Sequence, residues 1–140
     1  MFQTIYSVAG LTALCALILV ALWRGGATEQ TASGLYGVAW ISTLIAEYAL
    51  AQPVVWVAVI DAATLASFAI LAWRSQRDWV MIAMAFQGAS FAMNLLYLFD
   101  STIDRTLYVS ALAIATLGVL GSIAYGVCTN ALQRNTPRET

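Results

Sequence analysis

Five long apolar runs, separated by short polar or charged segments, make up most of this chain of 140 residues. A helix needs about 20 apolar residues to cross the hydrocarbon core of a bilayer, and each run is close to that length. Only 9% of the residues are charged, whereas a water-soluble domain carries about 25%. The sequence therefore predicts an all-α, polytopic integral membrane protein with five transmembrane helices, in which residues 1–140 form a single domain.

The segments between the runs predict where the helices begin and end. Pro53 divides an apolar stretch that is far too long for one span, so we expect a tight helical hairpin there. The polar segment from Gly25 to Ser33 and the charged segments at residues 74–78 and 100–105 are expected to be loops. The predicted helices cover residues 5–23, 34–51, 53–73, 79–99 and 106–133, and a polar cytoplasmic tail covers residues 134–140.

The arginines predict the orientation of the helices. With five spans, Arg105 lies on one side of the membrane and the other arginines lie on the opposite side, namely Arg24, Arg74, Arg77, Arg134 and Arg138. Because basic residues concentrate in cytoplasmic loops, we expect the N-terminus outside and the C-terminus in the cytoplasm. Aromatic belts are expected at both surfaces, with Trp23, Trp73 and Trp79 on the cytoplasmic side and Tyr6, Tyr48, Trp56, Tyr97, Phe99 and Tyr108 on the outer side.

The chain contains no His and no Lys. Without Lys there is no Schiff base, and without His there is no imidazole to bind a metal or to act as a general base. We find no nucleophile, phosphate-loop or metal-ligand motif. We therefore expect no enzyme activity, no cofactor and no metal, and the net charge of −1 does not suggest nucleic acid. Cys15 and Cys128 are expected to be buried free thiols.

Asp61 is the most unusual residue, because it lies eight positions into the third apolar run. A carboxylate within a membrane helix costs about 2.5–3.5 kcal/mol, so we expect it to face the interior of the bundle. The tight turn at Pro53 puts Ser42 and Thr43 at the same depth on the second helix, and these are its expected hydrogen-bond partners. Glu47 is expected closer to the outer surface.

The fourth run adds a polar face to this site. Gln87, Ser90 and Asn94 follow the spacing i, i+3, i+7, which puts them on one side of a helix. We favour the interpretation that these groups hold helices together, and the alternatives are a proton or cation path and a site for a small polar ligand. The predicted intramembrane cluster consists of Asp61, Glu47, Ser42, Thr43, Thr64, Gln87, Ser90 and Asn94.

The last run carries small residues four positions apart, at Ser110, Gly118, Ser122 and Gly126, interrupted by Ile114. Small residues at this spacing let two helix backbones approach each other closely, so this stripe is predicted to be a helix-packing surface. The spacing leaves open whether the neighbouring helix belongs to this chain or to another.

The segment from Asp61 to Asn94 resembles a segment of small, uncharacterised bacterial inner-membrane proteins with several spans. The resemblance rests on Asp61, on Phe86-Gln87-Gly88 and on the turn Trp73-Arg74-Ser75-Gln76-Arg77-Asp78-Trp79. Those proteins have a His at the position of Asn94. The resemblance implies a location in the bacterial inner membrane, as a multi-pass protein, and it implies no particular function.

These observations favour a non-catalytic accessory or scaffold subunit of a larger inner-membrane complex, possibly an energy-transducing one. Its partners would be other transmembrane subunits, or copies of itself as a homo-oligomer, together with lipids. The main alternative is a small oligomeric transporter or ion- or proton-conducting protein that uses Asp61 and Glu47. A membrane-permeabilising or immunity-type protein and an enzyme acting on lipid are less favoured.

Overall fold

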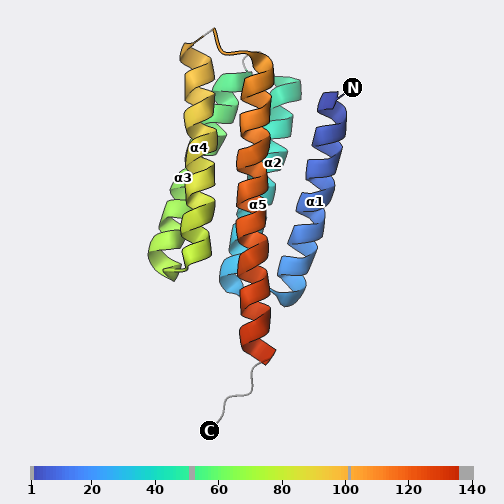
Figure 1. Ribbon diagram of the computed structural model, residues 1–140, viewed down its shortest axis with the longest axis vertical. Helices are drawn as coiled ribbons and strands as arrows, with labels where there is room; N and C mark the ends of the chain where they lie inside the picture. The colour runs from blue at the N-terminus through green and yellow to red at the C-terminus, as the bar shows by residue number, and fades with distance from the viewer. Residues whose placement is uncertain (1, 51–52, 101, 136–140) are drawn as a thin grey trace.

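The described residues form five α-helices, as the apolar runs predict (Figure 1). The computed structural model describes the backbone of residues 2–50, 53–100 and 102–135. Within these ranges it describes the side chains of residues 12–132, with the exception of residue 22. The helices are α1 (Phe2–Arg24), α2 (Ala27–Ala49), α3 (Pro53–Ser75), α4 (Asp78–Phe99) and α5 (Arg105–Asn135).

Three of these helices are long and apolar enough to cross a membrane, by length and composition. They are α3, α4 and the part of α5 from Arg105 to Leu132. In α1 the described apolar helix is the shorter piece Thr12–Ala21. The helix α2 falls outside this group, because it has polar residues in its first turns and Glu47 near its end. Three such helices indicate a membrane protein.

The helices run alternately up and down (Figure 1), and the packing of α2, α3, α4 and α5 on one another forms a ring. In this ring α2 packs on α3, α3 on α4, α4 on α5, and α5 on α2, while α1 lies outside against α2 and α5. We call the end with Arg24, Arg74 and Arg77 the basic end of the bundle; α1 and α3 finish there, and α2 and α4 begin there. The helix α5 continues past the basic end (Figure 1).

The apolar core fills the half of the ring near the basic end. Phe68, Val80 and Ile123 are completely buried there, and Val119 is almost so. Apolar packing of this kind joins α3, α4 and α5, and Tyr36 connects α2 to the same cluster through its ring contact with Phe68. The other half of the ring therefore has to be held together by different contacts.

The expected loop from Gly25 to Ser33 is wrong, because α2 begins at Ala27. The polar residues of this segment bond within the helix and do not require water. The Glu29 side chain accepts a hydrogen bond of 3.0 Å from the Gly26 backbone N–H, which leaves fewer unsatisfied groups at the helix start. The Thr31 and Ser33 hydroxyls donate to backbone carbonyls one turn earlier, at 2.7 and 2.6 Å.

Two other connections are short and well defined. Between α3 and α4, Gln76 has a φ of 49°, in the left-handed region that favours glycine. Before α5, Asp104 accepts a hydrogen bond of 3.2 Å from the Thr106 N–H and so caps the helix. Asp100 accepts hydrogen bonds from the Thr102 hydroxyl and N–H, and these lower the pKa of its carboxyl.

Candidate polar site in the bundle

Asp61 on α3 is held by three side chains of α4. Its Oδ1 accepts a hydrogen bond of 2.9 Å from Gln87 Nε2. Its Oδ2 accepts bonds of 2.7 Å from Ser90 Oγ and of 2.7 Å from Asn94 Nδ2. Since the three donors lie at i, i+3 and i+7, they share one face of α4, and this face donates all three hydrogen bonds to the carboxylate. This network joins α3 to α4 in the half of the bundle that the apolar core does not fill.

A further helix takes part through Tyr108 of α5. The Tyr108 hydroxyl donates a hydrogen bond of 2.6 Å to Asn94 Oδ1, and the Tyr108 ring stacks on Tyr97 with centroids 4.1 Å apart. Asn94 is completely buried, and its Nδ2 also donates to the Ser90 carbonyl at 3.2 Å. Both ends of the Asn94 amide are therefore occupied, with its oxygen toward Tyr108 and its nitrogen toward Asp61.

Asp61 lies at a small, partly open cavity lined by residues of α2, α3, α4 and α5. The cavity has a volume of about 80 Å³, and a single buried water needs roughly 10–15 Å³ on the same measure. It therefore has room for several waters beside the carboxylate. Its lining is mixed, with aromatic, hydroxyl and aliphatic side chains; beyond the Asp61 network these are Tyr36, Ala39, Trp40, Thr43, Val57, Leu112 and Thr116.

The remaining residues of the predicted cluster have separate positions. Thr43 lines the cavity, but the hydrogen bonds to Asp61 come from α4, so the expectation that Ser42 and Thr43 would be its partners is wrong. Ser42 donates to the Val38 carbonyl, and the buried Thr64 donates to the Ile60 carbonyl, each within its own helix. Glu47 is exposed on α2 and is not part of the cavity lining.

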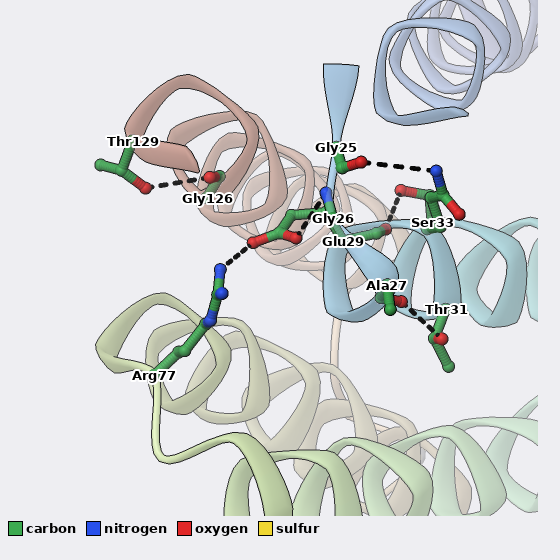
Figure 2. A network of polar contacts seen from close by, with 10 residues as sticks. Gly25, Gly26, Ala27, Glu29, Thr31, Ser33, Arg77, Gly126 and Thr129 are labelled. Carbon is green, nitrogen blue, oxygen red and sulfur yellow. Dashed lines mark hydrogen bonds and ion pairs between the residues drawn. The ribbon is translucent and has the colours of Figure 1, made fainter. Parts of the chain in front are cut away.

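A second polar site, which the sequence does not predict, lies at the basic end (Figure 2). Arg77, just before α4, donates from its guanidinium to Glu29 Oε1 and forms a salt bridge with it. The Glu29 side chain is completely buried, and its other oxygen accepts the bond from the Gly26 N–H. The pair connects α2 to α4, which lie diagonally across the ring, and so closes this end of the bundle.

The small-residue stripe of α5 packs inside this chain. A Cβ at Gly118 would collide with the Phe86 ring, and one at Gly126 would lie 2.6 Å from the Trp79 ring. Phe86 and Trp79 both belong to α4. Ser122 is buried and donates to the Gly118 carbonyl at 2.7 Å, whereas Ser110 is exposed. The stripe is therefore the surface of α5 that receives the large side chains of α4.

The structure corrects the predicted exposure of three side chains, Trp79, Cys15 and Cys128. Trp79 is only 3% exposed because its ring packs on Gly126, so it cannot belong to an aromatic belt, whereas Trp23 and Trp73 are more than 80% exposed. The Trp79 indole N–H has no hydrogen-bond partner among the described residues. Cys15 and Cys128 are free thiols on the surface, not in the interior. Tyr6 lies outside the described side chains.

The geometry therefore defines a carboxylate-centred polar cavity and an ion pair with a buried carboxylate at opposite halves of a helical bundle. Within the described part of the chain, no three side chains of His, Cys, Asp or Glu come together as a metal site would require. Comparison with family models, with curated proteins and with solved structures finds nothing that matches this chain.

Proposed function

We propose that the chain is a five-span protein of the bacterial inner membrane, with its N-terminus outside and its C-terminus in the cytoplasm. In support, α1 and α2 each have 23 residues, as α3 has, and they run alongside the three apolar helices α3, α4 and α5 (Figure 1). Arg24, Arg74 and Arg77 gather at one end of the bundle, which by the distribution of basic residues would be the cytoplasmic end.

We further propose that the protein conducts protons or small cations by way of Asp61. The observation that supports this best is a carboxylate at a cavity of about 80 Å³, inside a bundle whose other half is apolar. Ionisable residues within membrane helices are rare, and they usually mark ion or proton pathways. Because Glu47 is exposed and lies outside the cavity lining, the proposed pathway uses Asp61 without Glu47.

A purely structural role for Asp61 explains less of this geometry. A neutral amide or hydroxyl could also join α3 to α4, and it would insert into a membrane at lower cost than a carboxylate. Helix joining also needs no adjoining cavity, since tightly packed side chains leave few voids as large as a water molecule. A carboxylate beside space for water is what a site of ion exchange requires.

The test is ion flux across vesicles that contain the purified protein. Asp61→Asn keeps the size and two hydrogen-bonding groups but removes the ionisable proton, so flux should disappear while the fold remains. Glu47→Gln is the matched control, because it removes a carboxylate outside the cavity, and it should retain the wild-type flux. Wild-type vesicles that carry no proton or monovalent-cation flux above empty vesicles would reject conduction.

A role as an accessory subunit, which the sequence favours, is our second proposal, and a surface other than the predicted stripe supports it. The predicted stripe packs on α4, but Gly121 on the exposed side of α5 has open space around its Cα. Ile114 and Leu117, on the same side, are about two-thirds exposed. A helix of another subunit could approach α5 closely at Gly121, as small residues allow in membranes.

Purification in a mild detergent separates the two proposals. Other membrane subunits in fixed proportion would support the accessory role, and Gly121→Leu should then release the chain from them. The chain alone, or a homo-oligomer that shows flux after reconstitution, would support conduction. The absence of His and Lys supports both proposals over an enzyme.

A further inference from the structure

We infer that Asp61 is ionised and that the cavity beside it binds a small monovalent cation, of the size of sodium or ammonium, and not merely a proton. The inference rests on the proposed function in one respect, namely that Asp61 is the ion site. It adds the chemical class of the ion and the side of the bundle from which the ion enters.

The hydrogen bonds to Asp61 fit the ionised carboxylate. A protonated carboxyl group carries an O–H that must itself find an acceptor. A proton on Oδ2 would require the Ser90 hydroxyl to turn from donor to acceptor, because the Asn94 amide nitrogen cannot accept and Tyr108 holds that amide in place. A proton on Oδ1 would require the Gln87 amide to turn over. The ionised form needs no such change, because each of the three side chains can donate to it.

An ionised Asp61 leaves a charge to be balanced inside an apolar bundle. The three groups that bond to it, from Gln87, Ser90 and Asn94, are all neutral. The chain has no Lys, and among the described residues Asp61 forms no salt bridge with an arginine. Burying a charge is costly unless it is paired, so a cation in the adjoining cavity would offset the cost. The carboxylate has about four acceptor positions, and three are in use.

The size and the lining of the cavity limit the cation that fits. A volume of about 80 Å³ is small beside the roughly 300–1,000 Å³ of typical sites for drug-sized ligands. The Thr43 and Thr116 hydroxyls could join Asp61 as oxygen ligands. A calcium ion takes about 6–8 oxygen ligands, commonly from several carboxylates, whereas the cavity has a single carboxylate. The single carboxylate and the small volume of the cavity therefore match a small monovalent cation.

The packing also determines the side of entry. Phe68, Val119 and Ile123 fill the ring between the cavity and the basic end, and each is at most 1% exposed. The Glu29–Arg77 pair lies beyond them at that end. Asp61 is eight residues from the start of α3, or roughly 12 Å at the helical rise. In this conformation an ion therefore reaches the cavity from the end opposite the basic end, which is the outer side in the proposed orientation. Conduction to the basic end then requires the packing of Phe68, Val119 and Ile123 to open.

The test is direct binding of radioactive sodium to the purified full-length chain, with competition by ammonium and potassium. Choline keeps the ionic strength constant and is the control cation, because its three methyl groups make it too large for the cavity. We expect one saturable site per chain, no competition from choline, and full retention in Glu47→Gln. Asp61→Asn should weaken binding about 10- to 100-fold, since it removes a charged partner of the ion.

Each result has a definite meaning. A folded wild-type chain without saturable binding of sodium or ammonium would overturn the inference, and proton flux in the same chain would leave conduction itself intact. Saturable binding without any flux would overturn conduction and support the cation site. If Asp61→Asn does not fold, Thr116→Val serves instead: it removes one wall hydroxyl outside the Asp61 network, and unchanged affinity in this variant would contradict a cation bound in the cavity.

Discussion

The hydroxyl of Tyr108 donates a hydrogen bond of 2.6 Å to Asn94 Oδ1, and this contact decides which side of the Asn94 amide faces Asp61. It thereby links α5 to the α3–α4 network, in the half of the bundle that has little apolar core. The position of the Asp61 carboxylate thus depends on a residue 47 positions further along the chain.

Tyr108→Phe tests this link. The phenyl ring can still stack on Tyr97, but the bond to Asn94 is lost, so we expect the free energy of unfolding to fall by about 1 kcal/mol. Titration of the folded protein with a denaturing detergent measures the change. Tyr97→Phe is the control, because it preserves the stacked rings and the Tyr108 hydroxyl. If both variants lose the same free energy of unfolding, the hydrogen bond from Tyr108 to Asn94 does not contribute to stability beyond the loss of a tyrosine hydroxyl.

Gly118→Leu and Gly121→Leu form a matched pair on α5. At Gly118 the new side chain meets the Phe86 ring, so we expect a loss of about 1–3 kcal/mol in the stability of the isolated chain. At Gly121 the surroundings are open, so the same substitution should leave that stability almost unchanged. Thermal unfolding in detergent compares them. A Gly118→Leu chain as stable as the wild type would mean that α4 and α5 do not pack at this position.

The apolar runs predicted the five helices well. A helix that is buried in lipid or in a protein core must be long and hydrophobic, and both properties can be read directly from the sequence. The error at Gly25–Ser33 has a physical reason. The Glu29 side chain bonds to the Gly26 N–H, and neighbouring hydroxyls bond to carbonyls, so a polar segment is helical where polarity alone indicates a loop. A Glu three positions after a Gly at a helix start was the available signal.

The candidate site was predicted in part. The spacing of Gln87, Ser90 and Asn94 correctly put them on one face of a helix, because this follows from helical geometry alone. That this face, and not Ser42 or Thr43, donates to Asp61 depends on how α3 is rotated in the bundle, which a single sequence does not reveal. The contact of Glu29 with Arg77 joins residues 48 positions apart, and no local sequence pattern indicates a contact at such a separation.

The proposed orientation predicts the behaviour of reporter fusions. A reporter joined after Arg138 should be active in the cytoplasm, and one inserted at Ser101 should be active outside, because five of the six arginines would then face the cytoplasm. Two reporters, one active only in the cytoplasm and one active only outside, are fused in turn at each position, and their activities show on which side that position lies. The reverse result at both positions would invert the bundle, and the cation would then enter the cavity from the cytoplasm.

The Glu29–Arg77 pair predicts a non-additive pair of substitutions. Arg77→Gln leaves the buried Glu29 carboxylate without its cation, and because Arg77 is partly exposed we expect a loss of about 1–3 kcal/mol in the free energy of unfolding. Adding Glu29→Gln removes the unpaired charge and keeps a group that accepts from the Gly26 N–H, so the double variant should recover part of the loss. Arg74→Gln, at an exposed arginine of the same end, is the control and should change stability little. Losses that simply add in the double variant would show that the two side chains are not coupled, and that packing of α2 and α4 against their neighbours, without this pair, closes the basic end.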